Sequence, residues 1–182
     1  SRLYRAVKGA SDFAIGLGIN IPTGKDSMSM TQSYPDGKKV LSPGTLIIST
    51  VAPADNVYNI VKPDIKAGVE SNIVYVPFTK EGFHLGGSAF AQILNQVGNE
   101  TPDVKDANYF AECFEAVQEI VKENLALAGH DISAGGMVTT LLEMCFANTK
   151  GGIKVNASPV DGKGFNAADL EKVMFAENSG VL

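Results

Sequence analysis

The chain has 182 residues, of which 45% are hydrophobic and 19% charged, a balance typical of a soluble globular protein with one domain or two small ones. Lys and Arg number 15 and Asp and Glu number 20, and the resulting net charge of -5 argues against a broad nucleic-acid-binding surface. No apolar run reaches the roughly 20 residues of a membrane span, so the sequence predicts neither a nucleic-acid partner nor a membrane partner.

The first part of the chain predicts a helix, a hairpin and a buried strand. Apolar residues recur at helical spacing over residues 2–16. The turn signature at Tyr34–Gly37 follows the strand-like alternation of Ser27–Thr31, and it predicts a hairpin that returns through Val40. The β-branched run Leu46–Val51 predicts a strand that is buried on at least one face.

Beyond a boundary expected at Ala52–Asp55, strands and helices interleave, which indicates an α/β or α+β fold. The predicted elements are a strand at 72–78, helices at 88–97, 107–127 and 136–146, a strand at 152–156, a helix at 167–173 and extended chain from Phe175.

The longest predicted helix has one apolar stripe. Its members recur at i, i+4, i+7 and i+11 and are Phe110, Phe114, Val117 and Val121. We expect this stripe to pack on a sheet in which the strand at 72–78 is central.

The segment Pro22–Ser27 contains a Gly-Lys pair but is not a phosphate-binding P-loop. That motif needs a Gly at position 19, which is Ile, and a Ser or Thr at position 26, which is Asp. What remains is a tight turn that could hold an anion on Lys25, with Ser27 as a donor beside Asp26. The alternative is a solvated turn.

A second glycine-rich block, Gly129–Gly136, precedes an apolar helix. Asp131 supplies a hard oxygen ligand of the kind that Mg²⁺ prefers, and Gly135 and Gly136 would let the backbone approach an anionic ligand at a helix N-terminus. The alternative is a helix cap with a close helix–strand crossing, in which His130 is a hydrogen-bonded core residue.

Two further features receive no assigned chemistry. Gly82–Ser88 is another glycine-rich helix start, where close packing and anion binding both remain open. Glu177 is a lone carboxylate, which we expect to lie on the surface.

Taken together, these motifs resemble one family. The run Ile21–Met30 is similar to the GKDSMSM block of the large-type phosphoribosylformylglycinamidine synthases. Leu85–Ala89, His130–Gly136 and Glu177 follow in the order found in that family. The resemblance extends over essentially the whole chain, whereas the His130–Gly136 block alone marks the wider superfamily of aminoimidazole ribonucleotide synthetase and selenophosphate synthetase.

The resemblance implies a ligase of de novo purine biosynthesis. Such enzymes convert formylglycinamide ribonucleotide, glutamine and ATP to formylglycinamidine ribonucleotide, ADP and phosphate. ATP activates the amide oxygen as an iminophosphate, and ammonia from a glutaminase domain displaces the phosphate. The implied partners are therefore the ribonucleotide, an adenine nucleotide and the remaining domains of the same polypeptide, including the glutaminase (glutamine amidotransferase) domain. The implied location is the cytoplasm, and no catalytic residue is assigned within this chain.

The resemblance also implies a domain organisation. Residues 1–54 would be the end of a synthetase-like N-terminal subdomain, and residues 55–182 a truncated C-terminal subdomain with the layered sheet and packed helices of aminoimidazole ribonucleotide synthetase. A helical pattern starts at the first residues and an apolar run reaches the last ones, so we expect an excised piece of a longer chain that is inactive by itself.

Site residues follow from the same resemblance. Lys25, Asp26 and Ser27 are expected to face the ribonucleotide substrate, and Asp131 is expected to bind Mg²⁺ beside the phosphates of ATP or ADP. The backbone at Gly135–Gly136 is expected to approach the nucleotide. Ala134 stands where some relatives carry Asp, so a second carboxylate is lost there. The alternatives are a non-catalytic half of that enzyme, which holds a structural ADP, or a related member of the synthetase superfamily.

Overall fold

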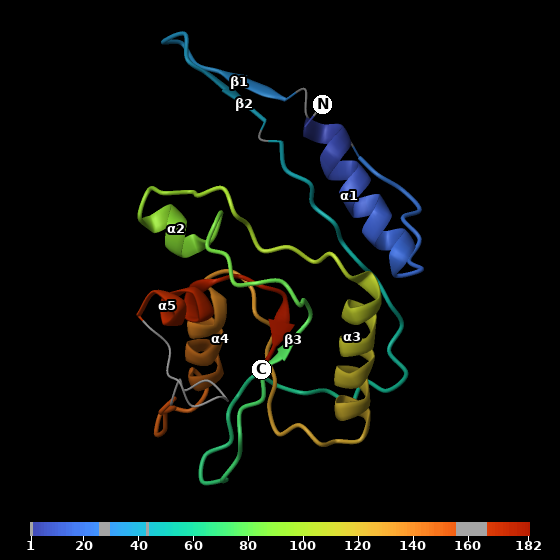
Figure 1. Cartoon of the computed structure of the whole chain (residues 1–182), viewed down its shortest axis with the longest axis vertical. Helices are drawn as coiled ribbons and strands as arrows, with labels where there is room; N and C mark the ends of the chain where they lie inside the picture. Colours follow the sequence, from blue (N-terminus) through green and yellow to red (C-terminus); the bar gives the residue numbers. More distant parts are fainter. Residues whose placement is uncertain (1, 26–29, 43, 156–166) are drawn as a thin grey trace. The chain divides into compact units, whose positions relative to one another are not determined.

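The computed structural model describes residues 2–25, 30–42, 44–155 and 167–182 (Figure 1). It divides into two compact units, Ser1–Asp55 and Asn56–Leu182. No helix within the described ranges is long and apolar enough to cross a membrane. Helices and short antiparallel sheets occur together, so the α+β form of the predicted fold class is confirmed.

Unit 1 contains α1 (Arg2–Gly16), β1 (Thr31–Ser33) and β2 (Lys39–Leu41). The predicted first helix is thereby confirmed. The predicted hairpin is also confirmed, because β1 and β2 pair antiparallel with Gln32 opposite Val40. The predicted strand residues 27–29 lie outside the described residues, and the described part of that strand starts at Thr31.

The hairpin turn is closed by short-range hydrogen bonds. The Tyr34 N–H donates to the Lys38 carbonyl at 2.9 Å, and the Gly37 N–H donates to the Tyr34 carbonyl at 3.0 Å. Gly37 has a φ of 82°, a conformation that residues with a side chain rarely adopt. The turn signature at Tyr34–Gly37 therefore determines the backbone conformation of this part of the chain.

The strand predicted at Leu46–Val51 is wrong. The segment pairs with no other strand among the described residues, and Ile47 and Val51 are 84% and 100% exposed. No described residue of unit 1 is buried. A β-branched run forms a strand only where a neighbouring strand satisfies its backbone groups. In the described ranges of unit 1, β1 and β2 pair with each other and neither pairs with this run.

Unit 2 contains four helices and one small sheet in its described part. In chain order the elements are β3 (Val76–Pro77), α2 (Ala89–Ile93), α3 (Ala107–Lys122), α4 (Gly136–Cys145), α5 (Ala167–Phe175) and β4 (Gly180–Val181). Figure 1 shows α4 and α5 side by side, and these two helices contact each other. All four helices predicted in this region are present, and α2, α3 and α4 are shorter than predicted.

The helix ends have local causes. The Asp106 carboxylate accepts the Tyr109 N–H at 3.0 Å and starts α3. Asn124 has a φ of 55°, and this left-handed residue follows the end of the helix before the predicted limit at Leu127. Asn95 has the same φ of 55° just after α2.

The centre of the sheet is β4 and not the predicted strand at 72–78. Val181 pairs antiparallel with Val76 on one side and forms a bridge with Asp131 on the other. The predicted strand is reduced to β3, and residues 72–75 pair with no strand in the described part of the chain. The strand predicted at 152–156 is also wrong over its described residues 152–155, and residue 156 lies outside them.

Aromatic packing joins α3 to the end of β3. Phe78 is buried and makes edge-to-face contacts with Phe110, at 5.0 Å between ring centroids, and with Phe114, at 6.5 Å. Two members of the predicted stripe, Phe110 and Phe114, therefore pack on the residue that follows β3, although no residue of α3 is buried. Phe114 remains 48% exposed.

Candidate functional site

Residues 176–182, here called the 176–182 segment, are held tightly inside unit 2. Ala176 and Asn178 are each 2% exposed. The Ile132 N–H donates to the Gly180 carbonyl at 2.8 Å, and the His130 N–H donates to the Leu182 carbonyl at 3.0 Å. The glycine-rich block around Asp131 therefore lies alongside the 176–182 segment and is joined to it by backbone hydrogen bonds.

Glu177 connects two helix starts. Its Oε1 atom accepts the Ala89 N–H at 2.8 Å and the Gly135 N–H at 2.8 Å. Ala89 is the first residue of α2, and Gly135 is the N-cap of α4. The expectation of a lone surface carboxylate is wrong, because Glu177 is half-buried and joins the two glycine-rich blocks of the sequence.

One signal in the sequence could have indicated such a residue. Gly135 caps α4 and has no side chain to accept the N–H groups of the first turn. These groups, and the N–H of Gly135 itself, then need acceptors from elsewhere in the chain or from water, and Glu177 accepts the Gly135 N–H. In the sequence, Glu177 is the one acidic residue of the stretch predicted to be extended from Phe175, where an acidic side chain is otherwise unexpected.

The backbone conformation and the close packing at positions 135 and 136 require glycine. Their φ angles are 90° and 72°. A Cβ atom at Gly136 would lie 2.8 Å from the Ala176 carbonyl oxygen, and one at Gly135 would lie 2.2 Å from the Thr139 hydroxyl oxygen. The start of α4 is therefore packed closely against the C-terminal end of α5, and not against a strand as in the alternative that the sequence left open.

The N–H groups of these two glycines already have protein acceptors. The Gly135 N–H donates to Glu177, and the Gly136 N–H donates to the Ser133 carbonyl at 3.0 Å. Nucleotide contacts at Gly135 and Gly136 therefore stay a prediction.

The block Gly82–Ser88 packs closely against protein. The Gly86 N–H donates to the Glu100 carbonyl at 2.8 Å, and a Cβ atom at Gly86 would lie 2.3 Å from that same oxygen. Asn178 donates from Nδ2 to the Gly82 carbonyl at 3.0 Å, while its buried Oδ1 has no hydrogen-bond partner among the described residues. Of the two possibilities that the sequence left open for this block, these contacts support close packing.

Asp131 combines a fixed backbone with an exposed carboxylate. Its backbone bridges to Val181, and its carbonyl accepts the Thr140 hydroxyl at 3.1 Å. Its side chain is 72% exposed, and Oδ1 lies 3.3 Å from Nδ1 of His130. The other ring nitrogen of His130, Nε2, lies 3.1 Å from Oε2 of Glu143. The half-buried imidazole therefore lies between two carboxylates.

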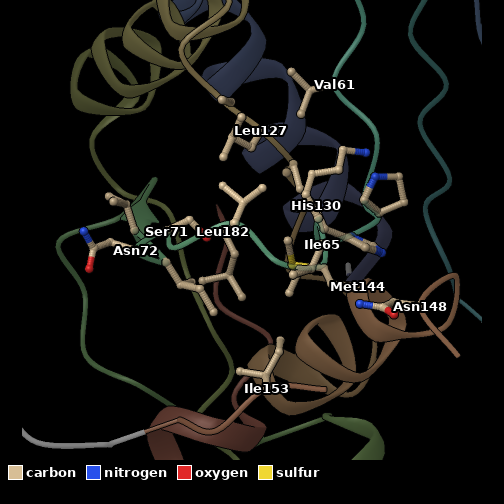
Figure 2. A pocket seen from close by; sticks show the side chains of 18 of the residues that line it. Val61, Ile65, Ser71, Asn72, Leu127, His130, Met144, Asn148, Ile153 and Leu182 are labelled. Carbon is tan, nitrogen blue, oxygen red and sulfur yellow. The ribbon is translucent and has the colours of Figure 1, made fainter. Parts of the chain in front are cut away.

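An open cleft of about 1590 Å³ adjoins these residues. His130 and Asp131 line it together with residues 61–76, 117–129, 144–155 and the end of the 176–182 segment, though not every residue of those ranges takes part. Figure 2 shows the apolar side chains of Val61, Ile65 and Leu182 directed into the cleft. The cleft is larger than the roughly 300–1,000 Å³ of an ordinary small-molecule site.

The donor set around Asp131 suits a metal ion that is shared with a ligand. In the described part of the chain, no group of three or more His, Cys, Asp or Glu side chains could hold a metal ion. Mg²⁺ is commonly bound by one or two carboxylates together with phosphate oxygens and waters. One exposed carboxylate such as that of Asp131 therefore fits a Mg²⁺ ion that arrives with a nucleotide.

The three residues predicted to bind the ribonucleotide belong to unit 1. Lys25 is exposed there. Asp26 and Ser27 lie outside the described residues. Their substrate role stays a prediction.

Two family models match the chain. Residues 1–53 match the FGAR-AT PurM_N-like domain, and residues 69–182 match the C-terminal domain of AIR synthase related protein. The second match covers most of unit 2, including Asp131, Gly135, Gly136 and Glu177.

Three curated relatives are similar along nearly the whole chain. The probable phosphoribosylformylglycinamidine synthase, chloroplastic/mitochondrial, of Arabidopsis thaliana is 40% identical over 100% of the chain. The phosphoribosylformylglycinamidine synthase of Dictyostelium discoideum is 36% identical over 99%, and the probable one of Caenorhabditis elegans is 38% identical over 91%. The chain spans only 12%, 14% and 13% of these relatives, respectively. The resemblance found in the motifs is thereby confirmed, and the chain belongs, through residues 69–182, to the family of AIR synthase related proteins.

Proposed function

We propose that this chain is part of the synthetase region of a phosphoribosylformylglycinamidine synthase, the purine-biosynthesis ligase that uses formylglycinamide ribonucleotide, ATP and glutamine. The names of the three relatives and the two family matches support this function. The single structural observation that carries it is the exposed Asp131 carboxylate, held on a fixed backbone at the cleft.

In this proposal Asp131 binds Mg²⁺ on the phosphates of ATP or ADP. Asp131 and Glu143 place two carboxylates beside His130, and of these two residues Asp131 lines the cleft. Bare phosphates would be repelled by these charges, and a dication with oxygen ligands removes the conflict. Bound Mg²⁺ would supply charge neutralisation to the phosphates, while the protein contributes the carboxylate and its fixed position.

We propose that the loop Gly135–Gly136 approaches the phosphates through the start of α4. The N–H groups of the first helical turn are donors that the helix itself leaves unsatisfied. In the described structure, Gly135 provides no side-chain cap for them, while the N–H groups of Gly135 and Gly136 themselves donate to Glu177 and Ser133. A helix N-terminus also favours negative charge.

The remaining assignments extend the same proposal to unit 1 and to the whole polypeptide. Lys25, Asp26 and Ser27 bind the ribonucleotide substrate, and residues 1–54 and 55–182 form two subdomains. The division into compact units after Asp55 and the end of the first family match at residue 53 support this boundary. The other domains, including a glutaminase domain, belong to the same polypeptide, which acts in the cytoplasm.

A second candidate is a structural nucleotide site. The bridge between Asp131 and Val181 favours it, because the backbone of the residue that would hold the metal is paired with the central strand β4. An ADP bound there would stabilise the native fold by mass action without being consumed.

Asp131→Asn in the natural full-length polypeptide tests the proposed function. We expect the variant to purify without nucleotide and Mg²⁺, as measured by chromatography of the released nucleotide and by metal analysis, and to melt at a lower temperature. Asp12→Asn, at an exposed residue of α1, is the matched control. A variant at position 131 that retains nucleotide and Mg²⁺ and melts like the wild type would show the assignment to be wrong.

Labelled nucleotide separates the two candidates. The wild-type protein is loaded with labelled nucleotide, freed of excess label and allowed to turn over with unlabelled ATP. Loss of label at the rate of turnover indicates a catalytic site. Label that remains through many turnovers indicates the structural site.

A further inference from the structure

Glu177 lies where the two glycine-rich blocks of unit 2 meet. A single carboxylate oxygen accepts two backbone N–H groups, one from Ala89 and one from Gly135, each at 2.8 Å. These donors lie 88 and 42 positions from Glu177 in the sequence. The contact therefore joins parts of the chain that nothing local would bring together.

The chemistry of this contact favours a fixed geometry. Hydrogen bonds from backbone N–H groups to an ionised carboxylate are shorter and stronger than neutral ones. A negative charge at the start of α4 is further stabilised by the helix dipole. Glu177 lies outside α4 and accepts the N–H of Gly135, the N-cap residue itself.

The backbone on both sides of Glu177 is anchored. On one side, the Ala176 carbonyl lies against Gly136 so closely that no Cβ atom would fit. On the other side, Asn178 is buried and donates to the Gly82 carbonyl. With both neighbours held, the Glu177 carboxylate sets the position of Gly135 rather than following it.

The loop from Asp131 to Gly135 is thus tied at both ends to the 176–182 segment. Asp131 bridges to Val181, and Gly135 donates to Glu177. Gly135 is held there with a φ of 90°. Removing the Glu177 contact frees one end of the loop while leaving the Asp131 end attached.

We propose that Glu177 is a positioning residue for the nucleotide site, which holds the Asp131–Gly135 loop and the start of α4 in the geometry that binds the metal–nucleotide complex. The proposal rests on the proposed function of Asp131. Glu177 itself does not touch the nucleotide and acts through Gly135.

The test uses the natural full-length polypeptide, stripped of nucleotide, and measures the Kd for Mg-ADP by calorimetry. Glu177→Ala removes the acceptor and is expected to raise the Kd about tenfold, the effect of losing one charge-assisted hydrogen bond. Glu177→Gln keeps an acceptor oxygen of the same shape and is expected to stay within about threefold of wild type. Glu171→Ala, at an exposed residue of α5, is the control and should leave the Kd unchanged.

Amide hydrogen exchange provides a second readout. Glu177→Ala should speed exchange at Ala89 and Gly135, and Glu177→Gln should restore their protection. A residue with only a general structural role would lower the melting temperature but leave the Kd of the folded protein unchanged. That result for Glu177→Ala would overturn the proposal.

If Glu177→Ala gives no folded protein, Ala89→Pro tests the positioning role of Glu177 instead. Proline is tolerated at the first position of a helix, and the extended Ser88, with φ -62° and ψ 158°, suits the residue before it. The substitution removes only one donor to Glu177, so we expect the Kd to rise about threefold. An unchanged Kd would overturn the proposal.

Asp131→Asn, measured in parallel, separates this proposal from the proposed function. Retention of nucleotide by the Asp131 variant contradicts the proposed function and, with it, any positioning role toward that site. Loss of nucleotide by the Asp131 variant together with a wild-type Kd in folded Glu177→Ala contradicts the positioning role alone.

Discussion

The hairpin of unit 1 and the 176–182 segment of unit 2 are both short stretches of extended chain, but they are stabilised in different ways. In the hairpin the Asp36 carboxylate accepts the Lys38 N–H two positions away, and the turn is closed within five residues. In the 176–182 segment Glu177 and Asn178 bond to residues 88 and 96 positions away. Hydrogen bonds between neighbouring residues are enough to form the hairpin. The 176–182 segment takes its structure only when distant parts of the chain have come together.

The largest expected effect is on aromatic packing in unit 2. Phe78→Ala should lower the free energy of unfolding of this unit by about 3–5 kcal/mol, because a buried ring that contacts Phe110 and Phe114 leaves a cavity. Phe114→Ala is the matched comparison and should cost only about 1–2 kcal/mol, since its ring is half-exposed. Chemical denaturation followed by circular dichroism measures both, and equal losses would contradict the assigned burial.

Alanine substitutions at two glycines with positive φ, one in each region, compare the stability of the two regions directly. Gly136→Ala should destabilise unit 2 by about 2–4 kcal/mol, because the substitution combines an unfavourable φ of 72° with a Cβ atom 2.8 Å from the Ala176 carbonyl. Gly37→Ala adds a Cβ atom that meets nothing within 4 Å and should cost only the backbone term of about 1–2 kcal/mol, within unit 1. Thermal unfolding of both variants is the measurement. A Gly136 variant no worse than the Gly37 variant would show that the 176–182 segment does not pack closely on α4.

The smallest expected effect is a pH dependence at the start of α3. The pKa of the Asp106 carboxyl lies below its ordinary value of 3.8, because the carboxylate accepts the Tyr109 N–H and also a hydrogen bond from Lys80. A lowered pKa in the folded state stabilises the protein above the unfolded pKa, and this contribution is lost as the pH falls through the folded pKa.

Asp106→Asn isolates that charge, since Asn also caps helices well. The melting temperature of the wild type should exceed that of the variant at neutral pH, and the difference should shrink as the pH falls below the ordinary pKa of 3.8. A difference that does not change with pH would mean that the charge of Asp106 contributes nothing.

The sequence predicts those parts of the fold that depend on nearby residues. The first helix, the Tyr34–Gly37 turn and the start of α3 each follow from residues within a few positions of one another. It also marks the two glycine-rich blocks and Asp131 as candidates, because glycine pairs and a carboxylate have recognisable local chemistry.

The errors fall where partners are distant. A β-branched run such as Leu46–Val51 carries strand propensity, but a strand needs a neighbour, and the sequence does not say where that neighbour is. Glu177 resembles any other exposed carboxylate until Ala89 and Gly135 are brought to it. The sequence predicts the central strand at residues 72–78, whereas β4 is the segment that is paired on both sides.

The position of β4 also has a consequence for the order of synthesis. Translation produces Val76 and Asp131 long before Val181, the residue that pairs with both. Until then the two earlier segments have no strand between them, and their backbone groups remain bonded to water. The sheet of unit 2 can therefore close only after residues 180–181 have left the ribosome, so the nascent chain must remain soluble through the intervening period without its central strand.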